Sequence, residues 1–217
     1  MSLELDPYAQ RRRRLQTAMN GRTAVIPAGR APARNFMANT YPLRSSSHFL
    51  YFVGRHIPDA ILVIGPTDCT LFISKPAHND ALWHGPAPTL STWTDEVHCP
   101  TAYLDDLQSS AVAHAVTVPV MDRYTNDFLT DLMKREQPIQ PGHIREVDEC
   151  LAQAIVALRL IHDNQAIGDL RRAADATVAA HRAALPAIRP GYREYTVWAA
   201  MQTALTERGM TAAYQPI

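Results

Sequence analysis

Short apolar runs and amphipathic spacings alternate along the first part of the chain. Apolar runs bounded by turn residues predict strands at 23–26, 60–64, 69–73 and 116–121. The second and third of these flank Gly65-Pro66-Thr67-Asp68, a turn sequence that predicts a hairpin. Helices are predicted at 7–19, 104–113 and 126–135, and a proline-rich irregular excursion is predicted from 75 to 100. This alternation is typical of an α/β fold in which helices flank a mixed sheet.

The pattern becomes wholly helical after a stiff break at Gln137-Pro138-Ile139-Gln140-Pro141. Apolar residues then recur at steps of three and four, which predicts a helix before residue 160 and two more at 164–185 and 193–208. The apolar stripe of the 164–185 helix is expected to hold Ile167, Leu170, Ala174, Val178, His181 and Leu185. We therefore interpret His181 as a core histidine. The predicted domains are residues 1–140, a linker helix at 141–162 and a helical segment at 163–217.

The charges of the chain are balanced. It has 21 basic and 21 acidic residues, which argues against nucleic acid or an anionic membrane as a partner. The one basic cluster, Arg11 to Arg14, lies on a predicted helix, and we expect it to form a solvated face. No apolar run approaches the roughly 20 residues that a membrane span needs. With 47% hydrophobic and 19% charged residues, the composition is typical of a soluble globular protein.

The cysteines and histidines form no recognisable site in the sequence. Cys69, Cys99 and Cys150 are widely spaced and include no Cys-x-x-Cys pair, which argues against a disulfide framework and a structural zinc site. The nine histidines include no His-x-x-x-His pair on a predicted helix, the spacing that directs two imidazoles at one metal ion. The N-terminus lacks the apolar core of a signal peptide, so we expect a protein of the reducing cytoplasm.

The stretch from Tyr41 to Gly54 gathers the strongest local signals. The three serines at 45–47 are candidate helix caps, and Gly54 is a candidate helix stop behind a cluster of aromatic residues. Arg44 stands just before that cluster, where its guanidinium either pairs with a carboxylate, stacks on a ring or points into solvent.

The order aromatic-Pro-x-Arg-x-x-Ser-x-Phe-x-Tyr-Phe-x-Gly in this stretch resembles the signature of the N-terminal domain of aminopeptidase P, the Xaa-Pro aminopeptidases. Leu82-Trp83-His84-Gly85 resembles the Trp-x-Gly segment of the same family. The segments 159–163 and 170–174 resemble the beginning of its catalytic domain. The resemblance implies an N-terminal domain followed by the first helices of a domain with the pita-bread fold.

The resemblance also implies a metallopeptidase that cleaves the bond between an N-terminal residue and a following proline. In the family, two divalent metal ions, with manganese as the suited metal, are held by two Asp, one His and two Glu beyond the part resembled here. We therefore expect no catalytic and no metal-ligating residue within 1–217, which alone should be inactive. A prolidase, a creatinase-like hydrolase and a non-catalytic interaction module are the alternatives, because all share this N-terminal architecture.

Trp83 is the candidate substrate-binding residue. In tetrameric members of the family, a tryptophan in this segment reaches the substrate pocket of a neighbouring subunit. The alternative is a buried tryptophan that anchors its own loop. The implied partners are a peptide with proline at its second position, further copies of the chain in a homo-dimer or tetramer, and the remainder of the catalytic domain on the same or a separate chain.

Overall fold

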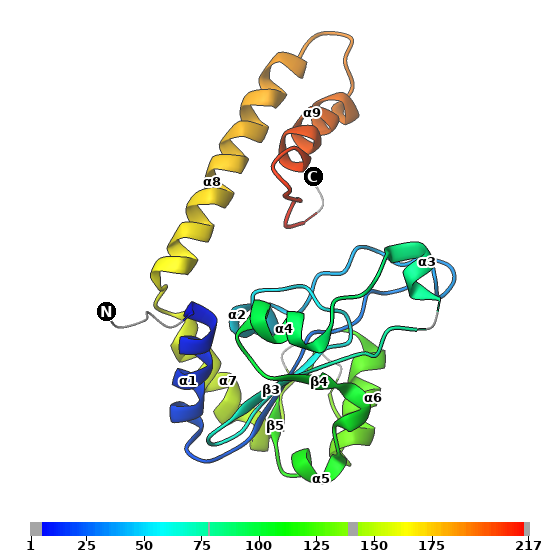
Figure 1. The fold of residues 1–217 in the computed structure, drawn as a ribbon. Helices are drawn as coiled ribbons and strands as arrows, with labels where there is room; N and C mark the ends of the chain where they lie inside the picture. Colours follow the sequence, from blue (N-terminus) through cyan, green and yellow to red (C-terminus); the bar gives the residue numbers. More distant parts are fainter. Residues whose placement is uncertain (1–5, 78, 139–142, 215–217) are drawn as a thin grey trace. The chain divides into compact units, whose positions relative to one another are not determined.

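Five short strands form a single mixed sheet in the first part of the chain (Figure 1). The computed structural model describes residues 6–77, 79–138 and 143–214. The strands are β1 (Ala24–Pro27), β2 (Ile61–Ile64), β3 (Cys69–Ile73), β4 (Thr101–Tyr103) and β5 (Val116–Thr117). Their order is β4-β3-β2-β1-β5, with antiparallel pairing among the central three and parallel pairing at both outer positions. The predicted α/β class with a mixed sheet is confirmed.

Helices cover both faces of this sheet. On one face pack α1 (Pro7–Met19), α2 (Ser47–Val53), α4 (Leu90–Val97) and α7 (Glu146–Arg159), and on the other pack α5 (Ser109–Val112) and α6 (Arg123–Met133). Successive side chains of a strand point to opposite faces. Leu62 therefore packs in the cluster beneath the first group of helices, while its neighbour Ile61 packs beneath the second. The core is thus divided by the sheet into two apolar layers.

Predictions that rest on residues close together in the sequence are confirmed. The predicted hairpin forms, with Ile64 opposite Cys69 across the turn. Helix α1 begins where the Asp6 carboxylate accepts a hydrogen bond from the Ala9 N–H (2.9 Å), and it ends at Asn20 in the left-handed region (φ 47°). A carboxylate at the first position and a residue that tolerates positive φ at the last therefore set the bounds of this helix.

The segment between β3 and β5 is more regular than expected. The excursion from 75 to 100 contains α3 (Asp80–His84) and α4, and β4 follows it. Thr89 caps the N-terminus of helix α4, since its hydroxyl accepts from the Thr92 N–H (3.1 Å). This cap was not predicted, because the two prolines just before it indicate irregular chain. The predicted 104–113 helix divides into a 3-10 turn and α5, because Leu107 is extended (φ −77°, ψ 105°). The predicted 116–121 strand ends at residue 117, two residues before a proline that has no N–H for the ladder.

The expectation of a solvated arginine cluster is wrong for half of its members. Arg13 and Arg14 are exposed, but Arg11 and Arg12 are buried, and Arg12 is only 2% exposed. Arg12 lies on the same face of α1 as Leu15 and Met19, at steps of three and four, so its side chain enters the core with theirs.

Backbone carbonyls bind the buried guanidinium of Arg12. Its Nη1 donates to Phe52 O (2.7 Å), and its Nη2 donates to Val97 O (3.0 Å) and His98 O (2.7 Å). These oxygens belong to the C-terminal ends of α2 and α4, where helix carbonyls lack intrahelical partners and carry partial negative charge. A cation therefore satisfies two helix ends at once, which explains how a charged side chain is stable inside the core.

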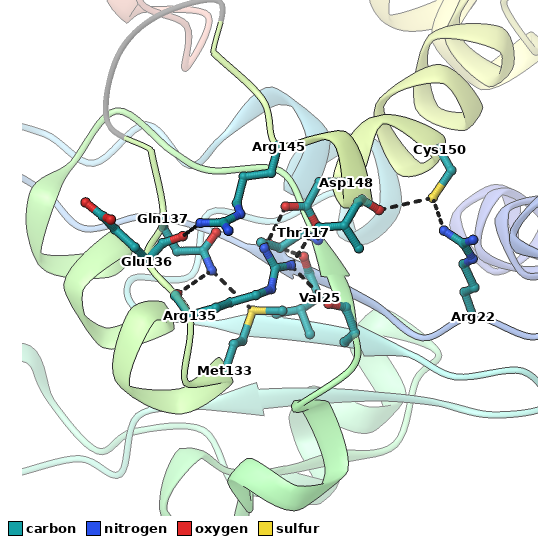
Figure 2. Close-up of polar contacts among 12 residues, drawn as sticks. Arg22, Val25, Thr117, Met133, Arg135, Glu136, Gln137, Arg145, Asp148 and Cys150 are labelled. Carbon is teal, nitrogen blue, oxygen red and sulfur yellow. Dashed lines mark hydrogen bonds and ion pairs between the residues drawn. The ribbon is translucent and has the colours of Figure 1, made fainter.

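A buried ion pair ties α7 to the edge of the sheet (Figure 2). Asp148, in the first turn of α7 and 1% exposed, accepts hydrogen bonds from both Nη1 and Nη2 of Arg135 at 2.7 Å. Its Oδ1 also accepts from the backbone N–H of Thr117 on β5 (2.8 Å). The Thr117 hydroxyl in turn donates to Val25 O on β1 (2.8 Å). The carboxylate thus satisfies a backbone donor that the outer strand would otherwise leave unpaired.

The chain divides into two compact units, Met1–Ile161 and His162–Ile217, and each is described by itself. Helix α7 belongs to the first unit, where it packs against α1. The proline-rich break and the domain boundary predicted at 140/141 involve residues 139–142, which lie outside the described ranges, and the predicted domain division stays a prediction. None of the helices in the described ranges has the length and apolar character needed to cross a bilayer.

The second unit is a pair of helices, α8 (Asn164–Ala184) and α9 (Glu194–Thr206), with a 3-10 turn, η2 (Leu185–Ala187), after the first. The buried residues of these helices are small, namely Ala176, Ala180, Ala184 and Ala204. The predicted stripe is not the buried face, since Leu170 and Val178 are exposed. His181 is exposed as well, so its interpretation as a core histidine is wrong. Small side chains let two helices approach closely, and the bulkier residues of α8 therefore stay on its outer surface.

We expect Arg12→Met to lower the free energy of unfolding by roughly 3 kcal/mol or more, because two buried carbonyls and one half-buried carbonyl lose their donor. Urea denaturation followed by circular dichroism measures this loss. Arg13→Met is the matched control: Arg13 is the next residue on the same helix but is exposed, and its replacement should change stability by about 0.5 kcal/mol or less. Equal effects of the two substitutions would contradict the role assigned to Arg12.

Candidate functional site

A cavity of about 790 Å³ lies between the loop after β1, the beginning of α2 and the segment that leads into α6. Two smaller cavities of about 560 and 430 Å³ share the side chains of Arg30 and Tyr124 with it. We call this surface the Arg30 groove. Its main cavity is lined by Gly29, Arg30, Arg44, Ser45, His48 and Asp122, among others.

Ser46 connects the groove to the sheet. Its hydroxyl accepts from the Phe49 N–H (3.2 Å), which caps α2, and donates to Pro27 O at the end of β1 (2.8 Å). Its backbone N–H donates to Ala28 O (2.7 Å). The other end of α2 is closed by Gly54 (φ 75°), where an added Cβ would lie 2.3 Å from the Tyr8 ring. The serine cap and glycine stop predicted for this stretch are both confirmed, and they position α2 as one wall of the groove.

Contacts with three other residues hold Arg30 at the centre of the groove. Its Nε donates to Asp59 Oδ1 (2.6 Å), and its backbone N–H donates to Asp122 Oδ2 (3.1 Å). The guanidinium lies over the ring of Tyr124, 5.6 Å from the centroid. The hydrogen bond to Asp59 and the negative charges nearby raise the pKa of Arg30, against a smaller opposing effect of burial. The second oxygen of Asp122 accepts from the Thr125 N–H (2.8 Å) and caps α6. This carboxylate therefore binds both the backbone of Arg30 and the first turn of α6.

Arg44 lies at the rim with its guanidinium exposed. It donates to Ser47 Oγ (3.4 Å), and within the part of the chain that the structure describes it reaches neither a carboxylate nor a ring. Nearby, the Ser45 N–H donates to His56 Nδ1 (3.1 Å), which requires that nitrogen to be unprotonated. Burial, and then the charge of Arg44, lower the pKa of His56. The rim therefore presents one cation beside a neutral imidazole.

His48 is the half-buried imidazole of the main cavity. Its Nδ1 lies 3.2 Å from Nη1 of Arg159, and because a guanidinium only donates, Nδ1 is the acceptor. Burial lowers the pKa of His48, and the charge of Arg159 lowers it further. With Nδ1 accepting, the imidazole in this arrangement is neutral and carries its proton on Nε2.

The groove offers guanidinium donors and aromatic surface, a combination suited to binding carboxylate or carbonyl groups. Across residues 6–77, 79–138 and 143–214, no group of three or more His, Cys, Asp or Glu side chains is placed to hold a metal ion. The sequence singled out Arg44 but missed Arg30, Asp122 and Tyr124, because they meet only after β1 and α6 are packed. Asp122 alone had a local signal, since it stands three residues before the amide that it caps.

Trp83 lies on α3, away from the three cavities described above. Its side chain is 82% exposed, and that of its neighbour Leu82 is 81% exposed. The alternative of a buried tryptophan that anchors its loop is therefore wrong. A contact between Trp83 and substrate stays a prediction.

Residues 8–117 match the family model described as aminopeptidase P, N-terminal domain. Xaa-Pro aminopeptidase 2 of Streptomyces coelicolor is 27% identical over 188 residues, which cover 81% of this chain and 39% of that protein. The chain thus spans less than half the length of this curated relative.

Solved structures share the fold. Aminopeptidase PepP from Pseudomonas aeruginosa superposes with a TM-score of 0.73 at 21% identity, over 93% of this chain and 49% of that one. Zinc-substituted aminopeptidase P from E. coli, in complex with product, gives a TM-score of 0.69 at 19% identity, over 95% of this chain and 50% of that one. The chain therefore spans about half the length of either protein.

We expect His48 to titrate below 6.5, its ordinary value, in an NMR titration of the imidazole C–H signals. Because the pKa is lower in the folded state than in the unfolded chain, the stability linked to His48 is present above pH 6.5 and is lost as the pH falls through the folded pKa. Arg159→Gln removes the nearby charge but not the burial, so it should raise the pKa partway toward 6.5. Titration of wild-type His48 at or above 6.5 would contradict the geometry described.

Proposed function

Since residues 8–117 carry the family's N-terminal domain, this chain belongs to the aminopeptidase P family, and we propose that it is the N-terminal portion of an Xaa-Pro aminopeptidase. Such an enzyme releases the N-terminal residue of a peptide whose second residue is proline. The observation that carries the proposal is the family match, which spans all five strands, α1 and α2. The name of the Streptomyces relative supports the same activity.

The proposed enzyme is a metallopeptidase. A zinc-substituted relative shows that a metal is compatible with the fold family. The side chains in the described ranges do not fit a metal site, since no cluster of three or more suitable ligands is present among them. We propose that the complete enzyme holds two divalent ions, with manganese as the expected metal. Their ligands would be residues that correspond to the part of the longer relatives that this chain does not match.

We propose two roles for the first unit. The Arg30 groove, with Arg30 held by Asp59 and Arg44 at the rim, is suited to receive a peptide carbonyl or carboxylate. The exposed Leu82 and Trp83 are suited to pack into a neighbouring copy of the chain in a homo-dimer or tetramer, because two large apolar side chains side by side in water are stabilised by a partner surface. A cytoplasmic location stays a prediction.

The first test of this proposal is activity. The full-length protein should cleave an Arg-Pro-Pro peptide in the presence of manganese and lose that activity with EDTA, while residues 1–217 alone should be inactive. The released amino acid is measured by chromatography. Turnover by residues 1–217 that EDTA abolishes would show that the metal ligands lie within this chain and would overturn their proposed placement.

Trp83→Ala in the full-length enzyme should raise KM or lower kcat and leave stability within about 0.5 kcal/mol of wild type, because the side chain is exposed. Trp93→Ala is the matched control. Trp93 lies on the neighbouring helix α4, is partly buried against the core, and should lower stability by about 1–3 kcal/mol when truncated. Unchanged kinetics for Trp83→Ala would remove Trp83 from the substrate site.

A further inference from the structure

Two of the three cysteines lie against each other at one end of the sheet. The sulfur atoms of Cys69 and Cys99 are 3.2 Å apart, and both thiols are free. The pair follows from the parallel register of β3 and β4, in which Leu71 lies opposite Thr101. The Leu71 N–H also donates to Pro100 O (2.8 Å), so the alignment continues before β4, and Cys99, two residues before that strand, lies beside Cys69, the first residue of β3.

This placement is compatible with a disulfide bond. Adjacent strands lie about 4.8 Å apart, within the range of about 4.4–6.8 Å between Cα atoms that disulfides span. The sulfur atoms need to approach by roughly 1.2 Å to reach the bond length of about 2.0 Å.

The two thiols have different surroundings. Cys99 is 2% exposed and packs in the core, whereas Cys69 is half-buried, so a reagent from solvent reaches Cys69 first. A hydrogen bond with Cys99 lowers the pKa of the Cys69 thiol; burial opposes this, and the positive charge of Arg12 lowers the pKa further. Asp68, the remaining charged neighbour, raises it. Since the thiolate is the nucleophile, Cys69 is the attacking sulfur of the pair and Cys99 the second.

We propose that Cys69 and Cys99 form a reversible disulfide, which makes this end of the sheet a thiol switch for disulfides of low molecular weight. The Cys69 thiolate attacks one sulfur of a small disulfide, forms a mixed disulfide and releases one thiolate. Cys99 then gives its proton to solvent, and its sulfur attacks the sulfur of Cys69 and displaces the second thiolate. One small disulfide is reduced to two thiols, and the two cysteine thiols lose two electrons and two protons in total.

The bond would close a loop that holds α3 and α4, since the two cysteines are 30 positions apart. That loop carries Trp83, and its second half ends at Val97 and His98, whose carbonyls bind Arg12. A cross-link at Cys69 and Cys99 therefore restrains both ends of the segment that presents the exposed tryptophan. The switch rests on the two thiols and their surroundings, and it holds whether or not the proposed peptidase activity is confirmed.

Peptide mapping of the native protein tests the proposal. The protein is incubated in glutathione buffers of increasing oxidised fraction, alkylated, and digested with trypsin and a Glu-specific protease. Lys75 precedes a proline and resists trypsin, so cleavage after Glu96 is what separates the two cysteines, into peptides 56–96 and 97–123. We expect these peptides to appear linked, two hydrogen atoms lighter than their sum, and to separate after treatment with dithiothreitol.

Single substitutions assign the order of events. Cys99→Ser should stop at a mixed disulfide of Cys69 with glutathione, Cys69→Ser should leave Cys99 reduced, and Cys150→Ser should not affect the cross-link. The proposal is overturned if Cys150 becomes glutathionylated while peptides 56–96 and 97–123 stay unlinked, or if they link only after the protein is unfolded in urea.

Discussion

A single buried guanidinium, that of Arg12, joins three helices that are far apart in the sequence. It reaches from α1 to the C-terminal carbonyls of α2 at Phe52 and of α4 at Val97 and His98. Because helix ends present unpaired carbonyls with partial negative charge, the cation and the two helix ends satisfy each other. The layer of helices over this face of the sheet therefore depends on a charge in a place where aliphatic packing would be expected.

Helix α2 connects this buried guanidinium to the Arg30 groove. Its C-terminal end is set by Arg12 and by the contact of Gly54 with Tyr8, while its N-terminal end is capped by Ser46, which also bonds to the end of β1. Helix α2 is thus bound at both ends, and His48 in its first turn and Arg44 just before it line the groove. At the β5 edge of the sheet, Asp148 likewise binds the first turn of α7 to Thr117 and Arg135.

What the sequence predicted well depends on neighbours along the chain. The caps of α2 at Ser46 and Gly54 and the hairpin between β2 and β3 each arise within a few residues, and their residue types identify them. What it missed depends on contacts between distant segments. Arg12 had the spacing of a core residue but the chemistry of a surface one, and Cys69 meets Cys99 only because β4 pairs in parallel with β3. Neither the spacing of the cysteines in the sequence nor the composition of the chain predicts that pairing.

The first strand of the chain is not at the edge of the sheet but between β2 and β5, and the first helix packs against α7, the last helix of its unit. During synthesis, the pairing of β1 with β5 can form only after a strand more than ninety residues downstream has been made (Ala24 pairs with Val116). The backbone N–H of Thr117 on β5 gains its acceptor later still, once Asp148 has left the ribosome. A nascent chain interrupted before α7 therefore leaves the N–H of Thr117 on the outer strand without its carboxylate acceptor, and an unprotected sheet edge is a site where chains associate.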